Sequence, residues 1–179
     1  MATPTTLPAT FVAGNVLTAA QQNALRGAFR VLQVNSTTLS TTFTTASTSY
    51  TDITGLSVSI TPSFTSSKIL VFAKLMGSQD FGINDGGYVR AVRDSTAIAV
   101  GDASGTHVQV STSFEVGFGS FMSSASINYL DSPATTSALT YKIQLVNSSA
   151  GTSYINRTKT DSATAPRAAS TITVMEISA

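Results

Sequence analysis

Three observations predict that this chain folds as an antiparallel β-sandwich or jelly roll. Roughly 30% of its residues are Ser or Thr, which favour strands and turns, and charged residues make up 11%. Short β-rich runs, separated by Ser, Thr, Gly, Asn and Asp, follow one another from Phe29 onward. Several runs alternate apolar and polar residues with period 2, as expected for strands with one buried face.

The length sets the domain count. With 179 residues and 18.5 kDa, the chain is long enough for one β-sandwich with a substantial core and short for two. A hydrophobic content of 42% and a net charge of +1 do not fit the composition of a disordered protein. We therefore expect a sandwich domain over residues 30–179 and an N-terminal appendage over residues 1–29.

The appendage begins with a Pro- and Thr-rich stretch that is expected to be extended. One short helix should follow, because Thr18 is a suitable N-cap, Gln21 occupies the third helical position of a capping box, and Gly27 is a suitable stop. Two roles are open for it. Either it caps the open end of the sandwich, or it docks on a neighbouring subunit through the apolar residues of the segment. These are Phe11, Val12, Val16, Leu17 and Leu25.

About ten strands are expected after the appendage, without the alternating helices of a parallel fold. The nearly continuous apolar run Lys68–Met76 suits a central strand covered on both sides, by the opposing sheet and by a neighbouring subunit. The expected strands are Arg30–Val34, Thr41–Thr44, Thr48–Ile53, Leu56–Thr61, Lys68–Met76, Gly87–Asp94, Ala97–Val100, Thr112–Phe118, Tyr129–Leu130, Leu139–Asn147, Ser153–Asn156 and Thr171–Ile177.

Three longer loops connect the strands. Asp80–Gly87 and Ser104–Ser113 contain Gly and are expected to form exposed tips, whereas Thr158–Ser170 has no periodicity and is expected to cross the surface. Five residues at or beside the tips are candidates for contact with a partner: Phe81, Asn84, Asp85, Tyr88 and His107.

Few residues in the sequence are candidates for catalysis or metal binding. His107 is the single histidine and the chain has no cysteine, so a metal site with several convergent ligands is not expected there. Asp80 and Asp85 could supply oxygen ligands to a calcium ion, but their spacing is not that of a calcium loop. We expect an ordinary Asx-rich turn there instead. We expect no enzyme, no cofactor, no metal and no catalytic residue.

Composition also bears on partners. Ten Lys and Arg balance nine Asp and Glu without a basic cluster, which argues against nucleic-acid binding. No apolar run approaches the length of a membrane span, and the first residues do not resemble a secretory signal. Phe114, Phe118 and Phe121 are near strand spacing; we expect them in the core, with a partner surface as the alternative.

Several segments, taken in order, resemble small structural proteins of tailed bacteriophages. The segment Phe11–Asn23 is similar to the N-terminal attachment stretch of phage tail and fibre proteins. The others cover most of residues 50–179: Thr54–Pro62, Thr65–Val71, Tyr88–Ile98, Tyr129–Pro133, Tyr141–Gln144 and Thr171–Ile177.

This resemblance implies a jelly roll similar to the tumour-necrosis-factor-like heads of trimeric fibres and capsid decoration proteins. It implies a homotrimer on the exterior of a phage capsid or tail, acting as a decoration, cement or short-fibre protein. Residues 1–29 would attach it to the major capsid protein or another virion protein. The alternative is a receptor-binding tip that recognises a host surface glycan through the two tip loops.

Overall fold

The computed structural model describes residues 16, 18–19, 30–80, 86–114, 121–148 and 151–178. The predicted arm and helix within residues 1–29 lie outside this part, apart from Val16, Thr18 and Ala19. The described part is almost entirely β structure, arranged as a jelly-roll-like antiparallel sandwich, so the predicted fold class is confirmed.

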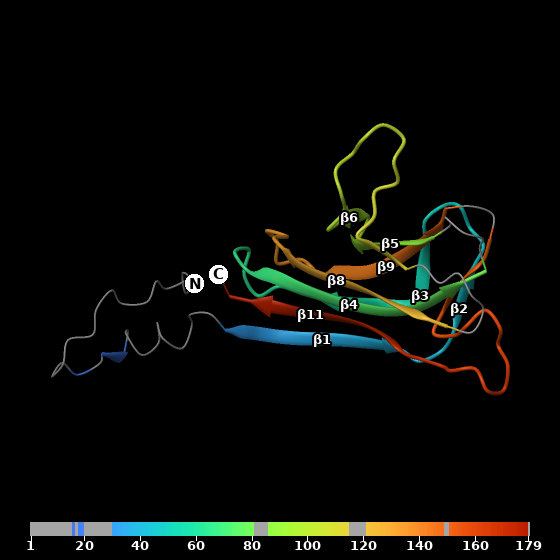
Figure 1. Ribbon diagram of the computed structural model, residues 1–179. Coiled ribbons are helices and arrows are strands. Elements are labelled where there is room, and N and C mark those ends of the chain that lie inside the picture. Colours follow the sequence, from blue (N-terminus) through green and yellow to red (C-terminus); the bar gives the residue numbers. More distant parts are fainter. Residues whose placement is uncertain are drawn as a thin grey trace.

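Two sheets make up the sandwich (Figure 1). Their strands, within the described residues, are β1 (Val31–Leu39), β2 (Phe43–Thr45), β3 (Thr51–Ile60), β4 (Lys68–Gln79), β5 (Gly87–Arg93), β6 (Thr96–Ile98), β7 (Thr112–Phe114), β8 (Ser123–Asp131), β9 (Leu139–Asn147), β10 (Ser153–Ile155) and β11 (Ser170–Ile177).

Sheet A has its long strands in the order β1-β11-β4-β8, and β10 and β2 extend it beside the end of β4. Sheet B has the order β3-β9-β5, with β6 and β7 both pairing with the remaining edge of β5. The chain changes sheets at most connections, as from β3 to β4, β4 to β5 and β8 to β9. All pairings are antiparallel, and this exchange of consecutive strands between two sheets is the arrangement of a jelly roll.

The core lies between the sheets and is built by period-2 alternation. In β4, Ile69, Val71, Ala73 and Leu75 are buried, and the residues between them face outward. The central position predicted for Lys68–Met76 is confirmed, because β4 pairs with β11 on one side and β8 on the other. Cover of its outer face by a neighbouring subunit stays a prediction.

Several strand bounds differ from the prediction. The expected strands Thr48–Ile53 and Leu56–Thr61 are one strand, β3, with a bulge between Asp52 and Ser57 in its pairing with β9. Gly55 adopts φ +84° within the bulge, which lets both Ile53 and Leu56 reach the core.

Strand β8 was recognised only at its end, as Tyr129–Leu130, whereas it begins at Ser123. Its outward residues Ser124, Ser126 and Asn128 are polar, so the sequence looks like a loop although Ala125 and Ile127 alternate into the core. Hydroxyl-rich faces of this kind hide strands from a search for hydrophobic periodicity.

The predicted aromatic set divides. Phe114 is buried in the core, as expected, and its ring lies against two backbones that carry no side chain: a Cβ on Gly77 or Gly87 would come within 2.7 or 2.5 Å of it. Phe121 is 67% exposed, so the core prediction is wrong for this residue. Phe118 lies outside the described residues.

A buried ionic cluster joins the two sheets. Asp131 on β8 accepts hydrogen bonds of 2.7 Å from the Arg93 guanidinium on β5 and the Tyr141 hydroxyl on β9. Burial, and then the hydrogen bond to Asp131, raise the pKa of Tyr141. Partial burial works against the charge of Arg93, but the bond to Asp131 outweighs it and raises the pKa of Arg93. The carboxylate therefore ties one strand of sheet A to two strands of sheet B.

The surface crossover before β11 is fixed at Asn156, which is fully buried with φ +62°. Its amide nitrogen donates to the carbonyl oxygens of Leu39 and Thr41, and its side-chain oxygen accepts from the Ser170 hydroxyl. The segment predicted as a crossover is thus a loop anchored in the interior at its beginning and end.

Candidate functional site

The outer face of sheet A carries an apolar row. Val34 on β1, Met175 on β11, Leu70 on β4 and Leu130 on β8 are consecutive partners in the strand register, so their side chains lie side by side across four strands. Val34 is 52% and Leu130 is 53% exposed. We call these four residues the apolar row.

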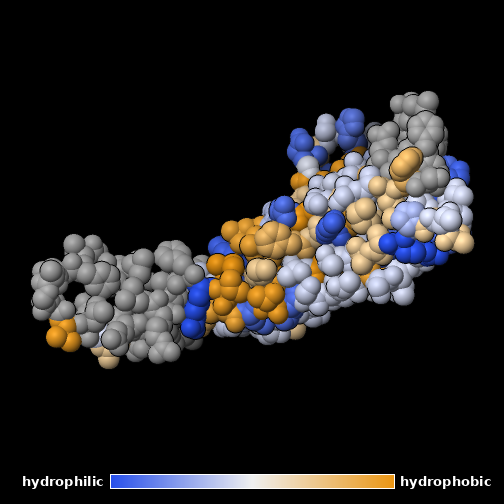
Figure 2. Space-filling view, turned by 60° about the horizontal axis from the view of Figure 1, so that its bottom comes forward, coloured by the Kyte–Doolittle hydropathy of each residue, from blue (hydrophilic) through white to orange (hydrophobic). Residues whose placement is uncertain are grey.

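Other apolar side chains enlarge the row at one end of the sheet. Val31 pairs with Ile177 on one side of it, and Phe72 on β4 lies on the other, with Val31 49% and Phe72 38% exposed. Figure 2 shows the hydrophobic colour gathered at this end of the molecule, while most of the remaining surface in view is pale or blue. A continuous apolar surface on a sheet face is typical of an interaction site rather than of free surface.

The rest of the outer face of sheet A is hydroxyl-rich. Lys74 is an exposed charge on it, and Ser36 and Thr173 form a 2.8 Å hydrogen bond between neighbouring strands. The polar members that face outward with them are Thr38, Thr171, Ser124, Ser126 and Asn128.

Residues 1–29 join the sandwich beside the apolar row. The Arg30 backbone amide donates to the Ser178 hydroxyl, and the Ser178 amide donates to the Arg30 carbonyl oxygen, both at 3.0 Å. Val31, the next residue, belongs to the enlarged row. Of the predicted attachment residues, Val16 is 90% exposed, and Phe11, Val12, Leu17 and Leu25 lie outside the described residues.

The outer face of sheet B has a different chemistry. Asp52 on β3 accepts hydrogen bonds from Lys142 at 2.8 Å and Gln144 at 2.7 Å, both on β9. The bond from Lys142 is the main cause that lowers the pKa of Asp52. Arg90 on β5 donates to Gln144 and stacks on the Tyr50 ring with its guanidinium carbon 3.6 Å from the ring centre.

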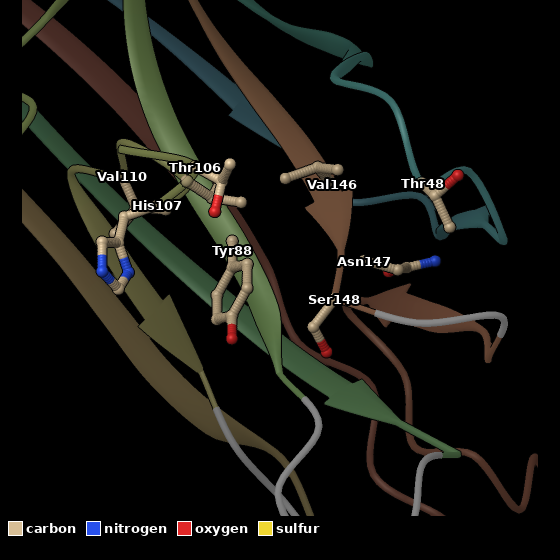
Figure 3. Close-up of a pocket in the computed structure, with 9 residues that line it drawn as sticks. Thr48, Tyr88, Thr106, His107, Val110, Val146, Asn147 and Ser148 are labelled. Carbon is tan, nitrogen blue, oxygen red and sulfur yellow. The ribbon is translucent and has the colours of Figure 1, made fainter. Parts of the chain in front are cut away.

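Tyr88 and His107, two of the predicted tip residues, meet at one pocket on this side of the molecule. The pocket has a volume of about 590 Å³, and Figure 3 shows the Tyr88 ring between His107 and Ser148. It is lined by Thr48, Tyr88, Thr106, His107, Val108, Val110, Val146, Asn147 and Ser148. The other predicted tip residues, Phe81, Asn84 and Asp85, lie outside the described residues.

The wall that carries His107 is the loop between β6 and β7, which stands above sheet B in Figure 1. Its two sides are linked where the Gly101 backbone amide donates to the Val110 carbonyl oxygen and the Gln109 side-chain amide donates to the Gly101 carbonyl oxygen. The Tyr50 hydroxyl also donates to the Gln109 carbonyl at 2.6 Å. These bonds hold the exposed loop over the sheet and give the pocket a defined shape.

The remaining candidates for catalysis or metal binding are the buried carboxylates, and these accept hydrogen bonds from other residues of the fold. Glu176 is fully buried and accepts bonds from Ser67, Gln33 and Ser63. Within the described ranges, no three His, Cys, Asp or Glu side chains lie close enough together to hold a metal ion. In the same residues, no helix is long and apolar enough to cross a membrane.

No protein-family model matches the chain, and no curated protein sequence matches it.

Sequence reasoning named the residues of the pocket better than those of the apolar row. His107 was found because it lies in a predicted loop, and Tyr88 because it lies directly after one. Val34, Met175 and Leu130 were missed because each is one apolar residue on a mostly polar strand face. Only the pairing of β1, β11, β4 and β8 aligns them.

Proposed function

We propose that this chain is a non-enzymatic structural protein of a tailed-phage virion, displayed on the exterior of the capsid or tail as a homotrimer. It acts as a decoration, cement or short-fibre module, and residues 1–29 attach it to the major capsid protein or another virion protein. The segment resemblance supports the virion assignment. The observation that supports a homotrimer is the apolar row on the outer face of sheet A.

The physical argument for trimerisation is burial. Burying the exposed half of a Val or Leu side chain stabilises an assembly by about 1 kcal/mol. In a trimer, each of the three copies buries its own row. The face is formed by paired strands and has small Ser and Thr side chains around the row, so neighbouring copies can approach closely at the row. Trimerisation also stabilises by mass action without disulfides, which the chain cannot form.

Attachment by the N-terminal segment fits the place where it enters the sandwich. The Arg30–Ser178 bonds put this junction at the apolar end of sheet A. An extended segment that orders on a neighbour can bury a large area, which offsets the entropy lost on ordering. Its apolar residues Phe11, Val12, Val16, Leu17 and Leu25 supply the contacts.

The trimer is tested by light scattering of the full-length protein and of Val34→Glu. We expect a mass near three times 18.5 kDa for the unchanged protein and a monomer for the variant, because the new charge would be buried at the interface. The matched control is Val108→Glu: Val108 is 51% exposed, like Val34, but lies on the β6–β7 loop. A monomeric unchanged protein, or a Val34→Glu variant that stays trimeric, would contradict this interface.

Attachment is tested with a chain that begins at residue 30. It should remain a folded trimer but no longer bind particles that lack the protein, whereas the full-length chain should bind them. Particle binding that survives the deletion would assign attachment to the sandwich instead.

A second candidate function is a receptor-binding tip that recognises a host surface glycan. The observation that favours it is the pocket in which Tyr88 and His107 come together from β5 and the β6–β7 loop. Loss of glycan binding on changing Phe81, another predicted tip residue, would assign recognition to the neighbouring loop as well.

A further inference from the structure

We propose that the pocket between Tyr88 and His107 binds an uncharged oligosaccharide built from hexose rings. This inference rests on the second candidate function, receptor recognition, and names its ligand class. It does not depend on the apolar row, which belongs to sheet A.

The dimensions suit such a ligand. A volume of about 590 Å³ lies within the usual range of pockets that hold small organic molecules, about 300–1,000 Å³. The pocket is open to the surface where β5 begins and β9 ends, so a chain of several sugar rings can enter it. The hydrogen-bonded β6–β7 loop gives it a wall before a ligand arrives, which lowers the entropic cost of binding.

The lining matches the two kinds of surface that a sugar ring presents. Val108, Val110 and Val146 are apolar and suit the C–H face of a ring. Thr48, Tyr88 and Thr106 carry hydroxyls without a hydrogen-bond partner in the described part of the chain, so these groups are available to ring hydroxyls.

Tyr88 is the central residue of the site. Its ring rests on the backbone of Gly86, where an added Cβ would lie 3.0 Å from a ring carbon. It pairs across the sheet with Val146, which places a ring and an apolar side chain side by side on the floor of the pocket. Figure 3 shows His107 on one side of this ring and Ser148 on the other.

The charge of the lining selects against acidic ligands. None of the nine lining residues is Lys, Arg, Asp or Glu, and His107 is the one titratable side chain besides Tyr88. A phosphate or a sialic acid carboxylate would find no fixed cation here, whereas uncharged hydroxyls can replace their hydrogen bonds to water with bonds to the hydroxyls of the lining. The ligand class is therefore neutral.

The experiment is saturation-transfer NMR on the full-length protein with maltotriose, lactose and chitotriose as neutral probes and 3′-sialyllactose as the acidic probe. We expect transfer to at least one neutral probe and none to the acidic probe. Tyr88→Ala should weaken binding of the neutral probe at least tenfold. Tyr88→Phe should weaken this binding less, because the aromatic ring is kept. Phe64→Ala is the matched control: Phe64 is 39% exposed, lies outside the lining, and its loss should leave binding unchanged.

His107→Ala, on an exposed loop, provides a second variant in case Tyr88→Ala does not fold, and it too should weaken binding. Three outcomes would each overturn the proposal: no transfer to any of the three neutral probes, equal binding by the unchanged protein, Tyr88→Ala and His107→Ala, or stronger binding of 3′-sialyllactose than of the neutral probes. Mass measurement of the same samples keeps the two proposals separate, because the pocket variants should all remain trimers if the apolar row forms the interface.

Discussion

The two outer faces of the sandwich differ in whether their side chains find partners within the chain itself. On sheet B, Asp52, Lys142, Gln144 and Arg90 hydrogen-bond to one another and need no partner. On sheet A, the apolar row finds no cover within the described residues, although its strands alternate in the same way. Period-2 patterning therefore builds both faces, while the residues placed outward decide which face keeps exposed apolar side chains.

The largest effect on stability is expected at the contact between the two sheets, the cluster formed by Asp131, Arg93 and Tyr141. Asp131→Ala should reduce the free energy of unfolding by about 3 kcal/mol, because it leaves the Tyr141 hydroxyl and a partly buried Arg93 without their acceptor. Urea denaturation measures the loss.

The control is Asp52→Ala on the outer face of sheet B. The Asp52 side chain is 51% exposed in its ion pair with Lys142, so this change should cost less than about 1 kcal/mol. Equal losses for the two variants would mean that the cluster between the sheets is no more important than a surface pair.

A smaller effect is expected beneath the pocket of sheet B. Gly87→Ala places a Cβ 2.5 Å from the Phe114 ring, which must shift, at a cost of about 2 kcal/mol. Gly101→Ala, with no atom within 4 Å of the added Cβ, should stay within about 0.5 kcal/mol of the unchanged protein. Thermal denaturation of the two variants compares them. If Gly87→Ala is as stable as Gly101→Ala, then Phe114 does not pack against this strand as described.

The smallest effect on stability is expected from Glu176 on β11 of sheet A, and it depends on pH. Burial raises the pKa of Glu176, but hydrogen bonds from Ser67, Gln33 and Ser63 outweigh it and lower the pKa below its ordinary value of 4.5. The resulting stability is complete above that value and is lost as pH falls through the lower pKa of the folded protein.

We therefore expect Glu176→Gln to be less stable by about 1–2 kcal/mol at pH 7, where the charged acceptor is lost. The two proteins should converge in stability as pH falls below 4.5 and through the lower pKa of the folded protein, because protonation removes the same charge from the unchanged protein. Urea denaturation across this range measures the difference. A gap that stays constant with pH would show that the carboxylate is not the source of the stability.

The fold class, the central place of Lys68–Met76 and the burial of Phe114 could be predicted from the residue pattern alone. Period-2 alternation is a local property, and a strand that shows it has few ways to bury its apolar side. The sequence also placed His107 in a loop and Tyr88 directly after one, because Gly and polar residues interrupt strands at their tips.

Other features could not be predicted from local pattern. The extent of β8, the burial of Asp131 and Glu176, and the apolar row all depend on which strands become neighbours. Val34 and Leu130 are separated by most of the domain in sequence, yet the register of four strands puts them in one row. Pairing between distant strands is set by the summed packing of the whole core, so no single segment contains the information that brings these residues together.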